Sequence, residues 1–236
     1  MFERPHHQRI AHVLGALDGD VLRRYGCLFG GGTCIALRYG EYRESVDMDF
    51  LVSDATGYRE LRGLVTGPAG LNALVRPGAQ PLTQLREVRA DQYGVRTVVL
   101  MDSQAIKFEI VREARITLEA AGPDDVLCGI GTLTRLDLAC SKLLANADRQ
   151  ADDSVFSRDV IDLAMMDLRL PALRAALAKA TEAYGPAVAR DLARAIDRLQ
   201  ERQGWLERCM QVMAMTLPKA VVWQKIRALR RVLKAE

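Results

Sequence analysis

The chain has 236 residues, of which 49% are hydrophobic and 6% aromatic, and its formal net charge is +3. This length allows one large domain or two small ones, with a core built mainly from aliphatic side chains. No apolar run approaches membrane-spanning length, so we expect no membrane partner, and the small net charge does not by itself indicate a nucleic-acid-binding protein. The polar N-terminus lacks a signal-peptide pattern and the five cysteines form no C-x-x-C pair. We therefore expect reduced thiols and a cytoplasmic location.

Apolar residues recur with helical spacing from His6 to Tyr25, which predicts a helical N-terminal stretch. His6, His7 and His12 raise the alternative of a metal site. However, positions i and i+5 do not share a helix face, and no cysteine or glutamate completes a ligand set. The pattern favours a solvated helix start.

A glycine-rich turn follows. Cys27–Phe29 is a short apolar run typical of a buried strand, and Gly30–Gly32 lead from it to Thr33, directly before a predicted helix over Cys34–Tyr39. Glycine allows a sharp turn and close approach to a ligand, and Thr33 can cap the helix. Free N–H groups at a helix start bind phosphate, so this turn is a candidate phosphate site.

The stretch Val46–Val52 alternates and then becomes fully apolar, which predicts a strand. Alternation puts Asp47 and Asp49 on one face, and Met48 and Phe50 on the other. Two neighbouring carboxylates repel each other, and divalent cations would relieve that repulsion. The strand is therefore a candidate metal site.

A helix over Tyr58–Val65, a loop over Gly67–Pro81 and three strands are predicted next. The strands are expected to form an antiparallel meander and cover Leu82–Ala90, Val95–Met101 and Ala105–Arg112. On the last strand, Lys107 and Glu109 share the face opposite an apolar one. They form either a Lys–Glu pair on a solvated face or, in the functional interpretation, Glu109 is a third carboxylate beside Asp47 and Asp49.

Strand patterns stop near Thr117–Asp125, and helical periodicity continues to the end, so we predict domains at 1–120 and 121–236. The predicted helices cover Leu133–Asp148, Ser154–Leu168, Pro171–Ala183, Pro186–Gln203, Trp205–Met215 and Pro218–Leu233. Lys142 and Arg149 share one helix face, while Arg158 and Asp162 stand four residues apart on the next helix. Such charges either form helix-to-helix salt bridges or face a ligand, and Lys142 is the stronger ligand candidate. The last helix is basic, which leaves open a solvated face or an RNA-facing patch.

Two strings of residues carry a resemblance to a known family. They are Gly31-Gly32-Thr33 with Arg43-x-Ser45-x-Asp47-x-Asp49-Phe50, and Lys142-Leu143-x-Ala145 with Arg149 and Arg158-Asp159-x-x-Asp162-Leu163. In this order the strings resemble the AbiEii/AbiGii toxin family of nucleotidyltransferases. The chain departs from that family at Gly30, where many members have a longer residue, and in the long spacer between Arg149 and Arg158.

The resemblance implies an α+β fold, with a mixed-sheet nucleotidyltransferase core and a helical C-terminal domain that closes the active-site cleft. It implies transfer of a nucleoside monophosphate from an NTP to an acceptor hydroxyl. The implied ligands of Mg²⁺ or Mn²⁺ are Asp47, Asp49 and Glu109, which also form the catalytic set. The implied nucleotide-binding residues are Gly31, Gly32, Thr33, Ser45, Lys142 and Asp159.

The family further implies a toxin of a toxin–antitoxin or phage-defence system, with a separately encoded antitoxin and RNA, in particular the tRNA 3′ end, as acceptor. Two alternatives stay open. One is a small-molecule nucleotidyltransferase of the aminoglycoside type, which shares the core signature. The other is a catalytically silent binding module, against which the intact set of three acids argues.

Overall fold

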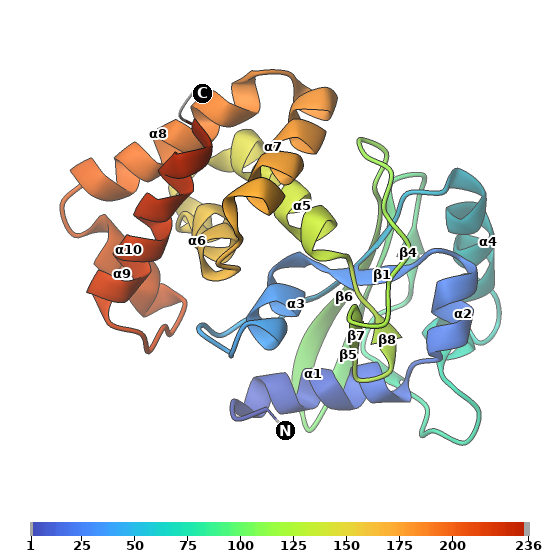
Figure 1. Ribbon diagram of the computed structural model, residues 1–236. Coiled ribbons are helices and arrows are strands. Elements are labelled where there is room, and N and C mark those ends of the chain that lie inside the picture. The colour runs from blue at the N-terminus through green and yellow to red at the C-terminus, as the bar shows by residue number, and fades with distance from the viewer. Residues whose placement is uncertain (1, 234–236) are drawn as a thin grey trace. The chain divides into compact units, whose positions relative to one another are not determined.

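The computed structural model describes residues 2–233. The chain forms two compact units (Figure 1). The sheet unit consists of Met1–Arg38 and Ser45–Thr134, and the helical unit consists of Tyr39–Glu44 and Arg135–Glu236. The domain boundary predicted between residues 120 and 121 thus lies inside the sheet unit. The segment Tyr39–Glu44 belongs to the helical unit, although its sequence neighbours on both sides belong to the sheet unit.

The sheet unit is built on a mixed sheet with strand order β1-β2-β6-β5-β3, and β4 also pairs with β5. The strands are β1 (Leu28–Gly30), β2 (Met48–Val52), β3 (Thr83–Gln84), β4 (Arg89–Ala90), β5 (Gly94–Met101) and β6 (Gln104–Arg112). β2 runs parallel to β6, and the other neighbouring strands are antiparallel. The predicted mixed sheet is confirmed. The predicted strand Leu82–Ala90 is wrong, because only its two ends pair with β5.

The core of the sheet is formed by aromatic rings on adjacent strands. Phe50 on β2 lies 5.3 Å from Phe29 on β1 and 5.1 Å from Phe108 on β6, between ring centroids. All three rings are fully buried. Stacked and tilted rings at this spacing add to the free energy gained by burial. They fix one face of β2 and β6, so the polar residues that alternate with them must lie on the other face.

Helices and short irregular elements complete this unit. They are α1 (Pro5–Ala16), α2 (Gly19–Arg24), α3 (Gly31–Arg38), α4 (Ala55–Val65), the 3₁₀ turn η1 (Gly70–Leu74) and the strand pair β7 (Val126–Leu127) and β8 (Ile130–Gly131). The N-terminal helical stretch is interrupted because Asp18 starts a new helix. Its carboxylate accepts hydrogen bonds from the backbone N–H of Asp20 and Val21, at 2.9 and 3.0 Å.

The helical unit packs α6, α7 and α8 against α5. Its elements are α5 (Arg135–Arg149), η2 (Asp153–Val155), α6 (Arg158–Met165), α7 (Leu170–Tyr184), α8 (Ala187–Glu201), α9 (Trp205–Val212), α10 (Lys219–Ala228) and η3 (Leu229–Leu233). The helix predicted over Ser154–Leu168 starts only at Arg158, because Phe156 and Ser157 are left-handed, at φ 51° and 50°. The Ser157 hydroxyl accepts a hydrogen bond from Trp205 Nε1 at 2.9 Å, which holds this break. No helix within residues 2–233 is both long and apolar enough to cross a membrane.

Candidate active site

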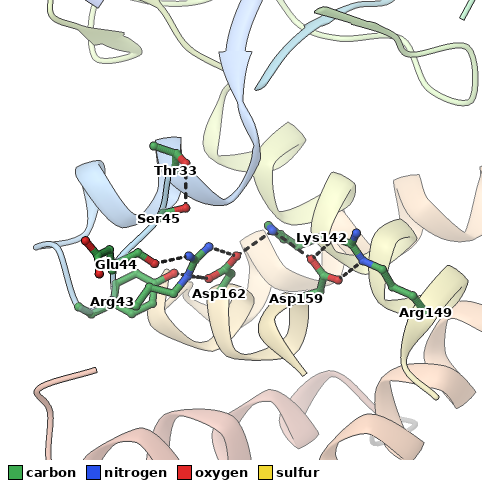
Figure 2. Close-up of polar contacts among 9 residues, drawn as sticks. Thr33, Arg43, Glu44, Ser45, Lys142, Arg149, Asp159 and Asp162 are labelled. Atoms are coloured by element: carbon green, nitrogen blue, oxygen red, sulfur yellow. Dashed lines mark hydrogen bonds and ion pairs between the residues drawn. The ribbon is translucent and has the colours of Figure 1, made fainter. Parts of the chain in front are cut away.

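The glycine turn lies against Asp49, the second acid of the Asp47-x-Asp49 motif. Gly31 starts α3 at a φ of +67°, and a Cβ built there would lie 2.8 and 3.0 Å from the Cβ and Cγ of Asp49. Both the backbone angle and the lack of space therefore require glycine at this position. Thr33 does not cap the helix as predicted, because α3 begins two residues earlier. Its hydroxyl instead hydrogen-bonds the Ser45 hydroxyl at 2.8 Å (Figure 2).

Gly30, where the chain departs from the family pattern, is tightly enclosed. A Cβ at Gly30 would lie 2.7 Å from the side chains of both Leu51 and Leu133. A longer residue at this position would collide with the core. The close packing around β1 therefore explains why this chain has glycine at position 30. As a result, no side chain at this position can contact a ligand.

Asp49 and Glu109 face each other across parallel strands. In the register of β2 and β6, Asp49 is the direct partner of Glu109. Gly30 on β1 is the partner of Asp49 on its other side, and Arg96 on β5 is the partner of Glu109 on its other side. Register partners on neighbouring strands point to the same face of a sheet. Asp47 lies in the loop immediately before β2, where it is partly exposed. The strand predicted from Val46 therefore begins two residues later, at Met48.

Glu109 is paired with two cations in this structure. Its Oε1 lies 3.2 Å from Arg96 Nε, and its Oε2 lies 2.7 Å from Lys107 Nζ. The Lys107–Glu109 ion pair, one of the two alternatives predicted from the sequence, is therefore present. Partial burial lowers the pKa of Lys107, but the bond to Glu109 and the charges of Glu109, Asp47 and Asp49 outweigh it and raise the pKa. Lys107 therefore lies in the field of all three acids.

This arrangement bears on metal binding. Among residues 2–233, no group of three or more His, Cys, Asp or Glu side chains is arranged to hold a metal ion. The donor chemistry nevertheless fits, since carboxylate oxygens are the ligands that Mg²⁺ prefers, and all three acids act on one cation, Lys107. Lys107 has a side chain that is 51% exposed, so it can leave Glu109 without disrupting the core. The metal-ligand role of Asp47, Asp49 and Glu109 stays a prediction.

The N-terminal histidines contact the backbone just before Asp47. His7 is fully buried, and its Nε2 accepts a hydrogen bond from the Ser45 N–H at 3.1 Å. The Nε2 of His6 lies 3.1 Å from the Val46 carbonyl oxygen. The predicted solvated helix start is therefore wrong for His7. Its spacing from Ile10 and Leu14 on the buried face of α1 was the signal that could have identified it.

In the helical unit, Asp162 is the centre of a buried ion-pair network. Its carboxylate accepts hydrogen bonds from Tyr42 Oη at 2.5 Å and from Arg43 Nε and Nη2 at 2.7 and 3.0 Å (Figure 2). Lys142 Nζ lies 2.7 Å from the same carboxylate. Burial would raise the pKa of Asp162, but Arg43 and Lys142 outweigh it and hold that pKa well below its usual range. The i, i+4 partner expected from the sequence, Arg158, is instead exposed.

Lys142 and Asp159, the two nucleotide-binding residues predicted in this unit, bind each other. Lys142 Nζ lies 3.0 Å from Asp159 Oδ1, and Arg149 Nε donates to Asp159 Oδ2 at 2.6 Å (Figure 2). Burial lowers the pKa of Lys142, but Asp162 and Asp159 outweigh it and raise the pKa. Lys142 is thus a buried, charged ammonium paired with two carboxylates, and its contact with a triphosphate stays a prediction.

Three basic side chains of the C-terminal stretch are paired with neighbouring acids. Lys219 pairs with Glu207, Lys225 with Asp167 and Arg230 with Asp197. Lys234, which extends the basic pattern in the sequence, lies outside the described residues. Such half-exposed pairs contribute little free energy, so they do not decide between a packed, solvated helix and an RNA-facing patch.

Comparison with known proteins identifies the family and the fold of this chain. Residues 15–232 match the family described as Nucleotidyl transferase AbiEii toxin, Type IV TA system. Two crystal structures share the fold: JHP933 from Helicobacter pylori, with 13% identity, TM-score 0.56 and coverage of 99% of this chain and 93% of that chain, and a candidate nucleotidyltransferase from H. pylori, with 14% identity, TM-score 0.53 and coverage of 97% and 92%. No curated protein gives a significant match. Because the family match spans most of the sequence, the chain belongs to the AbiEii nucleotidyltransferase toxin family of type IV toxin–antitoxin systems.

Proposed function

We propose that this nucleotidyltransferase transfers a nucleoside monophosphate from an NTP to a hydroxyl of RNA, with the 3′ end of tRNA as the favoured acceptor. The observation that carries the proposal is the row of residues across the sheet, in which Asp49 and Glu109 are register partners beside the Gly31 turn. Such a row places carboxylates beside the backbone N–H groups of a helix start, and a metal-bound triphosphate requires both kinds of group.

Each residue has a role in this proposal. Asp47, Asp49 and Glu109 would hold Mg²⁺ or Mn²⁺, which supplies charge stabilisation for the phosphoryl group and its leaving pyrophosphate. The backbone of Gly31 and Gly32 would bind the β- and γ-phosphates, since it starts α3. One hydroxyl of the Thr33–Ser45 pair donates to the other, so the one remaining hydroxyl hydrogen would donate to a phosphate oxygen at the same helix start.

The proposed reaction is a single displacement at the α-phosphorus. The acceptor oxygen forms a bond to the α-phosphorus, the bond from that phosphorus to the β-phosphate bridging oxygen breaks, and pyrophosphate leaves. Glu109 takes the hydroxyl proton as general base, which requires Lys107 to move off its Oε2. Arg96 stays within reach of Oε1 and keeps the carboxylate oriented.

The acceptor and the toxin role rest on the family resemblance. Wild type, Asp49→Asn and a matched control, Asp102→Asn, in an exposed turn of the same unit, should each be incubated with labelled NTPs and Mg²⁺, once with total RNA and once with an aminoglycoside. The proposal predicts Mg²⁺-dependent label at the tRNA 3′ end for wild type and Asp102→Asn only. Label on an aminoglycoside instead would support the small-molecule alternative, and no transfer to either acceptor would support the silent module.

Growth in a bacterial host gives a second test. A transferase that acts on an abundant RNA turns over many acceptors, so expression without the antitoxin should arrest growth. Asp47→Ala and Asp49→Ala, made at equal levels, should be harmless. Equal arrest by wild type and both variants would show that the harm comes from binding or aggregation and not from catalysis.

A further inference from the structure

A pair of histidines on α1 holds the backbone that leads into the acidic motif. His7 Nε2 accepts the Ser45 N–H at 3.1 Å, and His6 Nε2 lies 3.1 Å from the Val46 carbonyl oxygen. A carbonyl only accepts, so His6 donates while His7 accepts. The Val46 carbonyl belongs to the peptide bond that starts Asp47. The two rings therefore bind both ends of the Ser45–Val46 dipeptide.

This dipeptide has no strand to support it. Residues 43–47 form neither helix nor strand, and β2 begins only at Met48. Ladder hydrogen bonds therefore cannot fix the backbone where Ser45 and Asp47 branch from it. The buried Ser45 N–H needs a partner, and His7 supplies it from an element far away in sequence, while His6 meets the Val46 carbonyl at the surface. The Ser45 hydroxyl is fixed in turn by the Thr33 hydroxyl at 2.8 Å.

The position of His6 and His7 on α1 explains why their rings reach the backbone before β2. Pro5 stands in the first turn, where its missing N–H costs nothing, so His6 and His7 follow at the helix start. His7 shares the buried face with Ile10, Val13 and Leu14, so hydrophobic packing of the helix presses the ring against the segment before β2. A fully buried imidazole acceptor in an apolar stripe would be costly without the Ser45 N–H.

We propose that His7, assisted by His6, is a positioning residue that fixes the Ser45–Asp47 backbone for nucleotide and metal binding. The inference rests on the proposed function of Ser45 and Asp47. Neither ring touches the reacting atoms in this assignment. The rings act by restricting the backbone so that the Ser45 hydroxyl and the Asp47 carboxylate are preorganised, which reduces the cost of ordering them when the nucleotide binds.

The test compares variants of the full chain. His7→Leu removes the acceptor, whereas His7→Gln retains one, because the Gln side-chain oxygen can reach the position of Nε2. His12→Gln is the matched control, since His12 lies on the same helix but is exposed. We expect kcat/KM for NTP to fall by about 10- to 100-fold in His7→Leu, mainly through KM, and to recover in His7→Gln.

Hydrogen exchange at the Ser45 amide gives a readout that does not depend on activity. We expect exchange at least about tenfold faster in His7→Leu than in wild type, with His7→Gln and His12→Gln unchanged. If His7→Leu fails to fold, His6→Ala tests whether the histidine contacts position the backbone. This variant should fold, because the partly exposed His6 can be removed without leaving a core cavity. That variant should show a several-fold loss of kcat/KM.

The possible failures are distinguishable. Wild-type kcat/KM and Ser45 exchange in both His7→Leu and His6→Ala would overturn the inference. An equal loss in His7→Leu and His7→Gln would also overturn it, because the hydrogen-bond acceptor would then not be the feature that matters. A wild-type protein that transfers no nucleotide would refute the proposed function, while the exchange rates would still decide whether His7 fixes Ser45.

Discussion

Gly31 and Asp49 lie in direct contact, with the glycine backbone at a φ of +67° packed against the aspartate side chain. A Cβ at Gly31 would come within 2.8 Å of the Asp49 Cβ, and a non-glycine residue at this φ is strained by about 1–2 kcal/mol. The turn and the acid therefore form one geometric unit. The position of the carboxylate depends on the absence of a single methyl group.

Gly31→Ala should reduce nucleotide transfer by about tenfold or more, because the new methyl displaces the Asp49 side chain. Thermal unfolding and NTP incorporation should be measured beside Gly63→Ala on α4, where a Cβ meets no atom within 4 Å. The control should be neutral or slightly more stable. Full activity in Gly31→Ala would show that the contact with Asp49 does not position the carboxylate.

Asp162→Asn should lower the free energy of unfolding by about 3–5 kcal/mol, because Arg43 and Lys142 would be left as buried cations without their shared carboxylate. Urea denaturation checks this value. The control is Glu207→Gln, which breaks the half-exposed pair with Lys219 in the same unit and should cost less than about 1 kcal/mol. Similar losses in the two variants would mean that the network contributes no more than a surface pair.

The pH dependence of stability should reflect the same group. The folded pKa of Asp162 is depressed, so its contribution is complete above the ordinary value of 3.8 and is lost as the pH falls below 3.8 toward the folded pKa. Asp162→Asn should therefore lose less stability than wild type over that acid range. Parallel curves for the two proteins below pH 3.8 would contradict the assignment.

Lys142→Ala separates two roles for this lysine. The observed pairs with Asp159 and Asp162 predict a loss of about 3 kcal/mol or more in unfolding free energy. A nucleotide-binding role predicts, in addition, a raised KM for NTP in protein that is still folded at the assay temperature. Both should be measured beside Arg158→Ala, whose side chain is exposed on α6. An unchanged free energy of unfolding would show that the pairs of Lys142 with Asp159 and Asp162 do not stabilise the fold.

Lys107→Met should strengthen metal binding several-fold, equivalent to about 1 kcal/mol, because it removes the cation that now occupies Glu109 Oε2. Mn²⁺ binding followed by electron paramagnetic resonance measures this directly, without nucleotide or turnover. Lys219→Met, which removes a similar half-exposed lysine elsewhere, should leave the affinity unchanged. Weaker binding in Lys107→Met would indicate that Lys107 supports the site instead of competing with the metal.

Thiol reactivity should single out Cys128. Burial raises the pKa of Cys34 to about 12 and that of Cys209 to about 11, and it also raises the pKa of Cys27. Burial also raises the pKa of Cys128, but Cys128 is the exposed cysteine, so Ellman's reagent at pH 8 should find one fast thiol in the native protein and five after denaturation. Several fast thiols in the native state would show that the core around the buried cysteines opens readily.

The sequence by itself determined the features that depend on local pattern. Alternation along β2 and β6 identified which residues are buried and which share the polar face with Asp49 and Glu109, because side chains in a strand alternate with period two. The glycine run, the acidic motif and the helical C-terminal half could be recognised in the same way. Together they indicated the nucleotidyltransferase family that the comparison confirms.

Only the tertiary structure decided which distant residues meet. No spacing rule connects His7 with Ser45 or Arg43 with Asp162, since 38 and 119 residues separate them. From sequence alone, Arg158, Asp159 and Asp162 could equally well form helix-to-helix salt bridges or face a ligand, and His7 was expected to be solvated. Burial decided among them, because a charge or an imidazole removed from water must find a partner, and only the folded chain determines which partner lies within reach.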